Sequence, residues 1–427
     1  MRLGLWLRQV VLGRMVGASR PVLIGLATLW RRLLRRTTFI AVTGSVGKTT
    51  TTRLLSGILA TRGRTFHTVG NQNSGVAVPL NVLRVRPWHR FAVIEVGVGE
   101  PDRMRRLART LRPDMAIVLG VAPSHMSAFE SLDHIAAEKA TLLESLAVEG
   151  VVLLNGDDDR VARMSVPLRH PVRVFGTSPS FDLWADHLSS HWPARFSCHA
   201  HSMGVSVEIH TRLLGIHWAP AVMAALSAAA QLGIPLAAAA AALRDVEPYV
   251  ARMEPVCLPN GAVVIRDDYG ASVDSFEASL RFLREAQAER RVLVITDFSD
   301  SGLSRTARLK RLAAAASGWL ELLIIVGEQQ AYGVRRAIES GMSPQGVHGF
   351  PDLWTAAAFV RNEFRVGDLM LLKGRTTDHA ARLLFAQYGT VTCRLDHCPK
   401  TMLCDSCWEL GFQSDAGVRP ASLGSVV

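Results

Sequence analysis

The sequence predicts an α/β protein made of two consecutive domains, each with a mostly parallel sheet. The first observation is an alternation of β-branched, apolar runs with helical patterns from Phe39 to about Asp245, which is typical of repeated strand–helix units. The second is the same alternation further along the chain, with apolar runs at 291–298, 321–327 and 367–374. The third is a glycine-containing turn at 43–52, which lies between a predicted strand and a predicted helix.

Length and charge limit the class of protein. The 427 residues are enough for two or three domains with their own cores, and 48% hydrophobic with 20% charged residues is typical of a globular chain. The net charge of +11 is concentrated at one end, because residues 1–36 hold eight arginines and no acid, which leaves +3 for the other 391 residues. We therefore predict no nucleic-acid partner.

Residues 1–36 alternate apolar runs with arginines. The longest stretch without charge, Pro21 to Trp30, has ten residues, about half of a membrane span. One interpretation is an interfacial helix that binds anionic lipid through Trp6, Trp30 and the arginines; the other is a cytosolic helix packed on the body. The segment is too short for a folded substrate-binding domain. With no convincing signal peptide, we expect a cytoplasmic protein, and peripheral contact with the inner face of the membrane stays open.

The turn at 43–52 reads TGSVGKTTTT and is typical of a phosphate-binding loop. Its glycines let backbone N–H groups point toward an anion, and the helix that follows adds positive potential. Lys48 would reach the terminal phosphates of ATP, and the Thr49 hydroxyl would bind Mg²⁺. The usual loop has four residues between its glycines; here there are two, and Val42 stands where the first glycine would fall. The predicted nucleotide contacts in this loop are Gly44, Ser45, Val46, Gly47, Lys48, Thr49 and Thr50.

Polar side chains also accompany the strands predicted after this loop. Glu95 interrupts an apolar run, where a carboxylate is costly unless it is paired or bound to metal. His125 follows the next strand, and Asn155 ends the one after it. Ligands of parallel sheets bind at the carboxyl ends of the strands, so Glu95 and His125 lie where a site is expected. Between them and Asn155, an amphipathic helix carries Lys139.

In series, these motifs resemble the Mur ligase superfamily, most closely the MurF type, which adds a dipeptide to the peptidoglycan precursor. The resemblance covers roughly residues 38–390. It implies a P-loop ATPase-like central domain with a mostly parallel sheet, followed by a Rossmann-like C-terminal α/β domain; the family's N-terminal substrate domain has no counterpart in residues 1–36. Besides the short G-x-x-G-K-T loop, the motifs that carry it are residues 70–83, EVG at 95–97, VAPSHMSAF at 121–129, IAAEK at 135–139 and LLNGDD at 153–158.

The resemblance implies a role for each of these residues. Thr49, Glu95 and His125 would hold Mg²⁺ ions around the ATP phosphates. Lys139 matches the lysine that related ligases carry as a carbamate, which turns a neutral amine into an anionic metal ligand. Asn155, in the LLNGDD motif, is counted with the nucleotide contacts.

The second half of the chain supplies further matches. Arg252, in ARME, resembles the arginine of the family's G-R-x-E and would reach across to the γ-phosphate. Asp268 matches the aspartate that binds the ribose, and Lys373 matches a residue that contacts the acyl phosphate or the substrate. The asparagines with which the family seats the base are replaced here by Trp218 and Val222.

The stretch 160–210 has little periodicity and many histidines. Without helical or finger-like spacing, we favour a solvated insertion of short strands over a metal site. The histidines concerned are His187, His191, His199 and His201.

Four of the six cysteines fall in the last 35 residues. Four thiols within 15 residues fit a structural Cys₄ zinc site, in which His397 could replace one thiol. Unliganded thiols are the alternative, because the spacing is irregular and only one C-x-x-C is present. The four are Cys393, Cys398, Cys404 and Cys407.

The predicted protein is an ATP-dependent ligase. It would form an acyl phosphate from a substrate carboxylate, join the acyl group to the amine of an amino acid or peptide, and release ADP and phosphate. Its expected role is the synthesis of cell-envelope or peptidoglycan-like precursors. One alternative is a ligase that extends a poly-amino acid or cofactor, as in the folylpolyglutamate-like branch. The other is a membrane-tethered P-loop scaffold without ligase activity. The expected parts are a basic helical segment at 1–36, the ATP-binding domain at 37–248, the C-terminal domain at 249–392 and a Cys-rich tail at 393–427.

Overall fold

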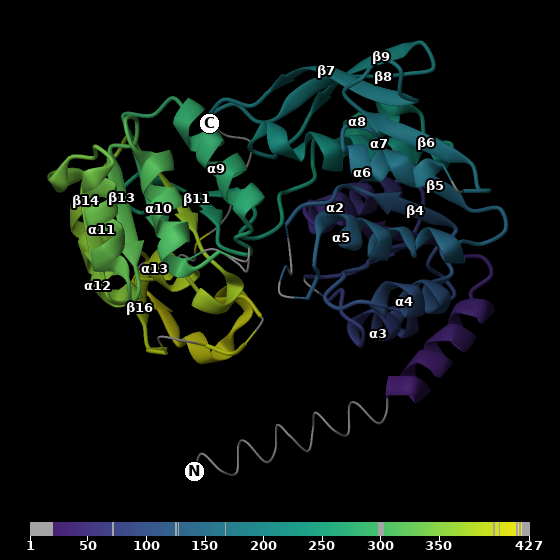
Figure 1. The fold of residues 1–427 in the computed structure, drawn as a ribbon, viewed down its shortest axis with the longest axis horizontal. Helices are drawn as coiled ribbons and strands as arrows, with labels where there is room; N and C mark the ends of the chain where they lie inside the picture. The colour runs from purple at the N-terminus through teal and green to yellow at the C-terminus, as the bar shows by residue number, and fades with distance from the viewer. Residues whose placement is uncertain are drawn as a thin grey trace.

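The computed structural model describes residues 20–70, 72–123, 126, 128–166, 168–297, 303–395, 398–400, 402–415, 417 and 420. Residues 38–210 supply a sheet of nine strands, and residues 254–373 supply a sheet of six. Each sheet forms a lobe with helices packed on it, and the two lobes lie side by side (Figure 1). The predicted pair of α/β domains is thereby confirmed. No helix in these described ranges is long and apolar enough to cross a membrane.

The nine-stranded sheet has the order β2-β3-β1-β4-β5-β6-β7-β8-β9 and is parallel from β2 to β7. Strand β1 pairs with β3 on one side and with β4 on the other. The order of the strands therefore switches direction at β1, and such a switch point creates a crevice at the carboxyl ends of the strands. The strands of this parallel part are β1 (Thr38–Thr43), β2 (Thr65–His67), β3 (Phe91–Glu95), β4 (Met115–Val118), β5 (Val151–Asn155), β6 (Val172–Gly176) and β7 (Leu183–Ser189). The helices of this lobe are α2 (Lys48–Ala60), α3 (Ala77–Arg84), α4 (Arg103–Leu111), α5 (Leu132–Ala140), α6 (Asp159–Ala162), α7 (Ala219–Gln231) and α8 (Leu236–Leu243).

Strand β1 is apolar because both of its faces are covered. Ile40 and Val42 belong to the core cluster on one face, whereas Phe39 and Ala41 belong to the cluster on the other. This two-sided burial is typical of parallel strands and explains the nearly continuous apolar run that predicted β1.

Residues 183–210 form an antiparallel extension of the same sheet rather than a separate insertion. The extension consists of β7 (Leu183–Ser189), β8 (Ser197–Ser202) and β9 (Val205–His210), and β7 continues the parallel part through its pairing with β6. Its inward side chains, such as Ala185, Cys198 and Ile209, are buried in the core. The predicted short strands are present, with one face buried and the other polar.

The six-stranded sheet has the order β10-β11-β15-β12-β13-β14, in which β10 is antiparallel to β11 and the other pairs are parallel. Its strands are β10 (Glu254–Cys257), β11 (Val263–Asp267), β12 (Arg290–Ile295), β13 (Leu322–Val326), β14 (Val347–Phe350) and β15 (Asp368–Lys373). Its helices are α9 (Val273–Glu285), α10 (Arg305–Ala316), α11 (Gln330–Glu339), α12 (Leu353–Glu363) and α13 (Ala381–Phe385).

A helix over residues 20–33 precedes β1 and packs one side on the first lobe (Figure 1). On that side Ala27 is buried, the Trp30 indole donates to the carbonyl of Val85 over 2.8 Å, and Arg31 forms an ion pair with Asp114 at 3.0 Å. One side of residues 20–33 therefore packs on the body, as one of the two interpretations expects, and residues 1–19 lie outside the described part of the chain.

The cysteine-containing tail docks on the second lobe. The short strands β16 (Gly389–Val391) and β17 (Phe412–Ser414) pair in antiparallel fashion, and Cys404 and Leu410 pack against Phe385 of α13 in a small apolar cluster. The Asp405 carboxylate also accepts two hydrogen bonds from the Arg266 guanidinium, at 2.6 and 3.0 Å. The tail thus obtains its core from the lobe beneath it.

Candidate active site

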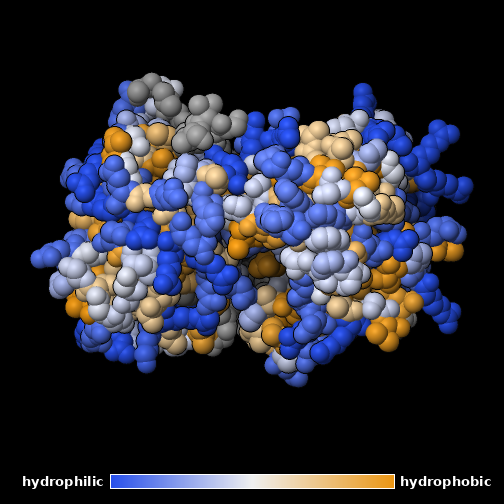
Figure 2. Space-filling view, turned by 90° about the horizontal axis from the view of Figure 1, so that it is seen from above, coloured by the Kyte–Doolittle hydropathy of each residue, from blue (hydrophilic) through white to orange (hydrophobic). Residues whose placement is uncertain are grey.

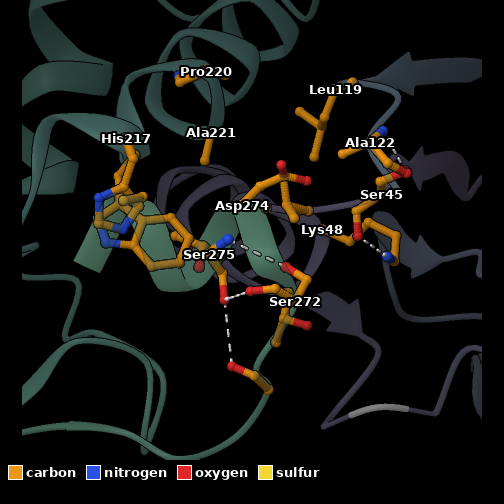
Figure 3. A pocket seen from close by; sticks show the side chains of 18 of the residues that line it. Ser45, Lys48, Leu119, Ala122, His217, Pro220, Ala221, Ser272, Asp274 and Ser275 are labelled. Carbon is orange, nitrogen blue, oxygen red and sulfur yellow. Dashed lines mark hydrogen bonds between the residues drawn. The ribbon is translucent and has the colours of Figure 1, made fainter. Parts of the chain in front are cut away.

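A cavity of about 700 Å³ lies at the junction of the two lobes. Its wall includes the phosphate loop and the ends of β3, β4 and β5 from the first lobe, and residues after β11 and in α9 from the second. Figure 2 shows the surface hollowed between the lobes, and Figure 3 shows Lys48 and Ser45 on one side of the cavity with His217 on the other. The cavity lies at the crevice that the strand order predicts.

The phosphate loop turns sharply between β1 and α2. Gly44, with φ of 154°, leaves too little space for a side chain, because an added Cβ would lie 2.8 Å from the Cβ of Leu119. Gly47 has φ of 83° and caps the N-terminus of α2 in the left-handed region, where glycine is favoured. Two glycines at this spacing therefore suffice to place the N-terminus of α2 at the cavity.

Lys48 extends along the loop. Its ammonium group donates to the carbonyl of Gly44 at 2.8 Å and to that of Ser45 at 3.3 Å. Burial lowers the pKa of Lys48; the nearby charge of Arg252 also lowers it, whereas Glu95 raises it. Lys48 is a partly buried cation, and the hydrogen bonds that the structure gives for it end on neutral carbonyls, so its charge is placed to receive an anionic ligand.

Glu95 lies at the end of β3 and is 1% exposed. Its two carboxylate oxygens accept hydrogen bonds from the Thr49 hydroxyl at 2.9 Å and from the Asn73 amide at 2.6 Å. The structure therefore brings together two of the three residues predicted to hold Mg²⁺, and their oxygens are ligands that Mg²⁺ prefers. His125, the third, lies outside the described residues.

Lys139 lies in the last turn of α5 and is 2% exposed, although it does not form part of the cavity wall. Burial and the neighbouring charge of Lys48 lower its pKa to about 7. A large fraction of its side chain is therefore the neutral amine near pH 7.

Asn155 and Arg252 line the cavity from opposite lobes. The Asn155 amide donates to the carbonyl of Leu119 at 2.7 Å, which joins the ends of β5 and β4. Arg252 lies 4.8 Å from the centre of the Tyr269 ring, in a turn where its neighbours Ala251 and Met253 have φ of 60° and 50°. Two non-glycine residues in the left-handed region store strain, which is typical of functional turns.

Asp268 does not line the cavity. Its carboxylate faces the Arg266 guanidinium, at 3.3 Å, on the side where the tail docks. Its neighbour Asp267 lines the cavity instead and forms an ion pair with Lys373, which is itself fully buried and also donates to Ser275 at 2.9 Å. Of the two adjacent aspartates, Asp267 is therefore the one that lines the cavity, and its ion pair with Lys373 orients its carboxylate.

Three further side chains in the wall received no functional role from the sequence. His217 is partly buried, and this burial lowers its pKa to about 4, so its ring is neutral near pH 7. Trp218 is 7% exposed, and its indole N–H has no partner among the described residues; the same holds for one carboxylate oxygen of Asp274. The resemblance described above implies an asparagine at the position of Trp218, and this replacement was the available signal in the sequence.

The four tail cysteines are free thiols in this structure. Cys404 is buried, which raises its pKa to about 12, and its sulfur lies 3.3 Å from Nδ1 of His379. Within the described residues, three or more metal-ligand atoms lie within 4.8 Å of one another only in a group on β7 and β8, not in the tail. The zinc site of the tail stays a prediction.

Comparisons with known proteins agree with this geometry. Residues 42–229 match the model of the Mur ligase middle domain, and residues 251–376 match that of the Mur ligase glutamate ligase domain. A UDP-N-acetylmuramoyl-tripeptide–D-alanyl-D-alanine ligase of Mycobacterium tuberculosis is 27% identical over 380 residues, which cover 83% of this chain and 74% of that protein. The ligase of the same name from Escherichia coli is 28% identical, over 75% of this chain and 71% of that protein.

Solved structures show the same fold. A MurF structure from Acinetobacter baumannii superimposes with a TM-score of 0.79 at 24% identity, covering 86% of this chain and 80% of that one. A MurF structure from Thermotoga maritima in complex with ADP gives 0.72 at 20% identity, covering 83% and 80%. Both family domains are therefore present, in the family's order and around one cavity, and the chain belongs to the Mur ligase family of ATP-dependent ligases.

Proposed function

We propose that this chain joins the carboxylate of a nucleotide-linked peptide to the amine of a dipeptide, as the names of its relatives describe, with the cavity between the lobes as the active site. The observation that carries the proposal is the convergence of Lys48 and Arg252, from different lobes, on one cavity. A site for phosphoryl transfer needs positive charge on more than one side of the phosphates, and neither lobe supplies it alone.

The residues suggest how the reaction would proceed. Lys48 and the N–H groups at the start of α2 bind the β- and γ-phosphates, and Arg252 approaches from the second lobe. Mg²⁺ held by Thr49 and Glu95 would neutralise charge on the phosphate oxygens. A carboxylate oxygen of the acid takes the γ-phosphoryl group and ADP leaves. The amine nitrogen then attacks the acyl carbon, loses its proton, and displaces inorganic phosphate.

The substrates are tested by omission. The protein is incubated with ATP, Mg²⁺, UDP-N-acetylmuramoyl-tripeptide and D-alanyl-D-alanine, and each component is left out in turn. We expect ADP release to need both the acid and the amine, and mass spectrometry to show the joined product. ADP release that is equal without them would instead favour the scaffold alternative.

Lys139 is proposed to carry a carbamate. Carbon dioxide reacts with neutral amines, and burial beside Lys48 provides one near pH 7. The resulting carboxylate would place a negative charge near Lys48 and the Mg²⁺ ligands, and would remove the cost of a second buried cation beside Lys48.

Trp218 is proposed to donate a hydrogen bond to the nucleotide in place of the missing asparagine. Trp218→Phe keeps an aromatic ring but removes the N–H, so we expect the KM for ATP to rise roughly fivefold, with a smaller change in kcat, since one net hydrogen bond is worth about 1 kcal/mol. Steady-state kinetics measures this, with the exposed Trp88→Phe as the control. An unchanged KM would show that the indole N–H faces no ligand.

The tail is proposed to bind one structural zinc ion through its cysteines. Cys393, Cys404 and Cys407 belong to or pack against the apolar cluster at α13, and the sulfur of Cys404 lies 3.3 Å from Nδ1 of His379. Binding would need the sulfur atoms to move closer together and lose their protons, which zinc itself promotes.

The helix at 20–33 is proposed to bind an anionic membrane surface. Four aliphatic side chains at helical spacing face away from the body, and each is more than half exposed: Val22 64%, Leu26 54%, Leu29 57% and Leu33 63%. Arg32, Arg35 and Arg36 are exposed beside this stripe. A second copy of the helix would bring like charges together, whereas anionic lipid complements them.

Replacing Leu26, Leu29 and Leu33 by serine should abolish sedimentation with vesicles that contain phosphatidylglycerol, because both the apolar and the charged contacts are needed for interfacial binding. The unaltered chain should bind such vesicles at low salt and dissociate from them as the salt concentration rises. A matched control replaces three exposed valines elsewhere, Val148, Val166 and Val366, by serine. If the unaltered chain does not bind these vesicles at low salt, the membrane proposal is wrong.

A further inference from the structure

The polar face of the antiparallel extension holds a group of potential metal ligands. One ligand atom from each of Asp186, His187 and His199 lies within 4.8 Å of the other two. None of the three lines the cavity between the lobes, and all are at least partly exposed. The group is therefore separate from the nucleotide site and open to a diffusing ion.

The sheet itself brings these residues together. Asp186 of β7 and His199 of β8 are direct partners in the antiparallel register, so their side chains leave the same face. His187 would point to the opposite face in a regular strand, but the register shifts between Asp186 and Ser189, and His187 has φ of 48°. This bulge re-aims the imidazole toward its two neighbours, a use of bulges that is common at functional sites.

A fourth side chain orients the carboxylate. Nε2 of His201 lies 2.9 Å from Oδ1 of Asp186, and its ring stacks on Trp184 with centroids 3.9 Å apart and planes at 14°. One carboxylate oxygen is thereby held by His201, as metal-ligating carboxylates commonly are.

We propose that Asp186, His187 and His199 bind a divalent transition metal ion of the zinc class. Two imidazoles and one carboxylate favour zinc over Mg²⁺ or Ca²⁺, which prefer oxygen ligands alone. Ligands on a tetrahedral zinc ion lie about 3.3 Å apart, so small side-chain rotations would close the site. Three protein ligands leave the fourth position for water. The ion would tie β7 to β8 across the bulge.

The test measures zinc binding by calorimetry on the full chain and on single variants. The His199→Ala variant should bind one equivalent of zinc less than the unaltered chain. In the His187→Ala variant, the affinity for this zinc ion should fall by at least about tenfold. His201→Phe keeps the stack on Trp184 but removes the hydrogen bond to Asp186, and should weaken binding by about 10–100-fold. His201 is a positioning residue, so this variant should keep the stoichiometry while the affinity falls.

The matched control is His210→Ala. His210 is on the neighbouring strand β9 and pairs with Glu208 at 3.1 Å, outside the group of three. The His210→Ala variant should bind as much zinc as the unaltered chain, with the same affinity. Any zinc bound by the tail cysteines would be common to all variants and would cancel in the comparison. Equal zinc stoichiometry and affinity in the unaltered chain, His199→Ala and His187→Ala, with circular dichroism confirming the fold of each, would overturn the proposal.

Discussion

Replacing Lys48 by alanine should reduce ATP turnover by about 10³-fold or more while the protein still folds. The ammonium group is the partly buried cation of the phosphate loop, and removing one preorganised charge that faces a transferring phosphoryl group costs at least this much. Folding should not suffer, because burial already penalises the charged form of Lys48 and its only hydrogen-bond partners given by the structure are two loop carbonyls.

ADP release with both substrates present measures the effect, and thermal unfolding measures the fold. Lys310→Ala is the matched control, because Lys310 is an exposed lysine on α10 of the second lobe. It should change neither quantity. Normal ATP turnover in the Lys48→Ala variant would show that residues 43–52 are not the phosphate-binding loop.

Lys139→Ala should lose at least about 100-fold in activity and recover part of it when formate or acetate is added, since a small carboxylate can enter the space of the carbamate. The activity of the unaltered chain should also fall below pH 7 when bicarbonate is limiting. The pKa of Lys139 lies near 7, so acid protonates the amine and prevents its reaction with carbon dioxide.

The same anions should not rescue Lys48→Ala, because that variant lacks a cation. Full activity in Lys139→Ala, or loss without any rescue at any anion concentration, would contradict the carbamate and leave Lys139 as a packing residue of α5.

The nucleotide loop was predictable because its determinants are local. The apolar strand, the two glycines and the helix follow one another in the sequence, and each fixes the conformation of its own neighbours. Glu95 was predictable for a related reason, since a carboxylate in an apolar strand indicates a partner. Its partner Asn73, by contrast, reaches it from a loop 22 residues away, which no local pattern encodes.

Adjacent residues with the same chemistry mark the limit of this reasoning. Asp267 and Asp268 cannot be told apart by composition, yet successive side chains at a strand end point to opposite sides. The structure directs Asp267 to the cavity and Asp268 to Arg266. The histidines of β7 and β8 show the same limit. Their spacing in the sequence is irregular, and they come together only through a bulge and the pairing of β7 with β8.

The central claim is that ATP activates a carboxylate, and an isotope measurement tests it most directly. The terminal carboxylate of UDP-N-acetylmuramoyl-tripeptide is labelled with ¹⁸O, and the phosphate released during turnover with D-alanyl-D-alanine is analysed by mass spectrometry. If a carboxylate oxygen takes the γ-phosphoryl group, that oxygen leaves with the phosphate, so each phosphate formed should carry one ¹⁸O atom. Phosphate without the label would mean that water attacks ATP, and would contradict a ligase mechanism for this acid.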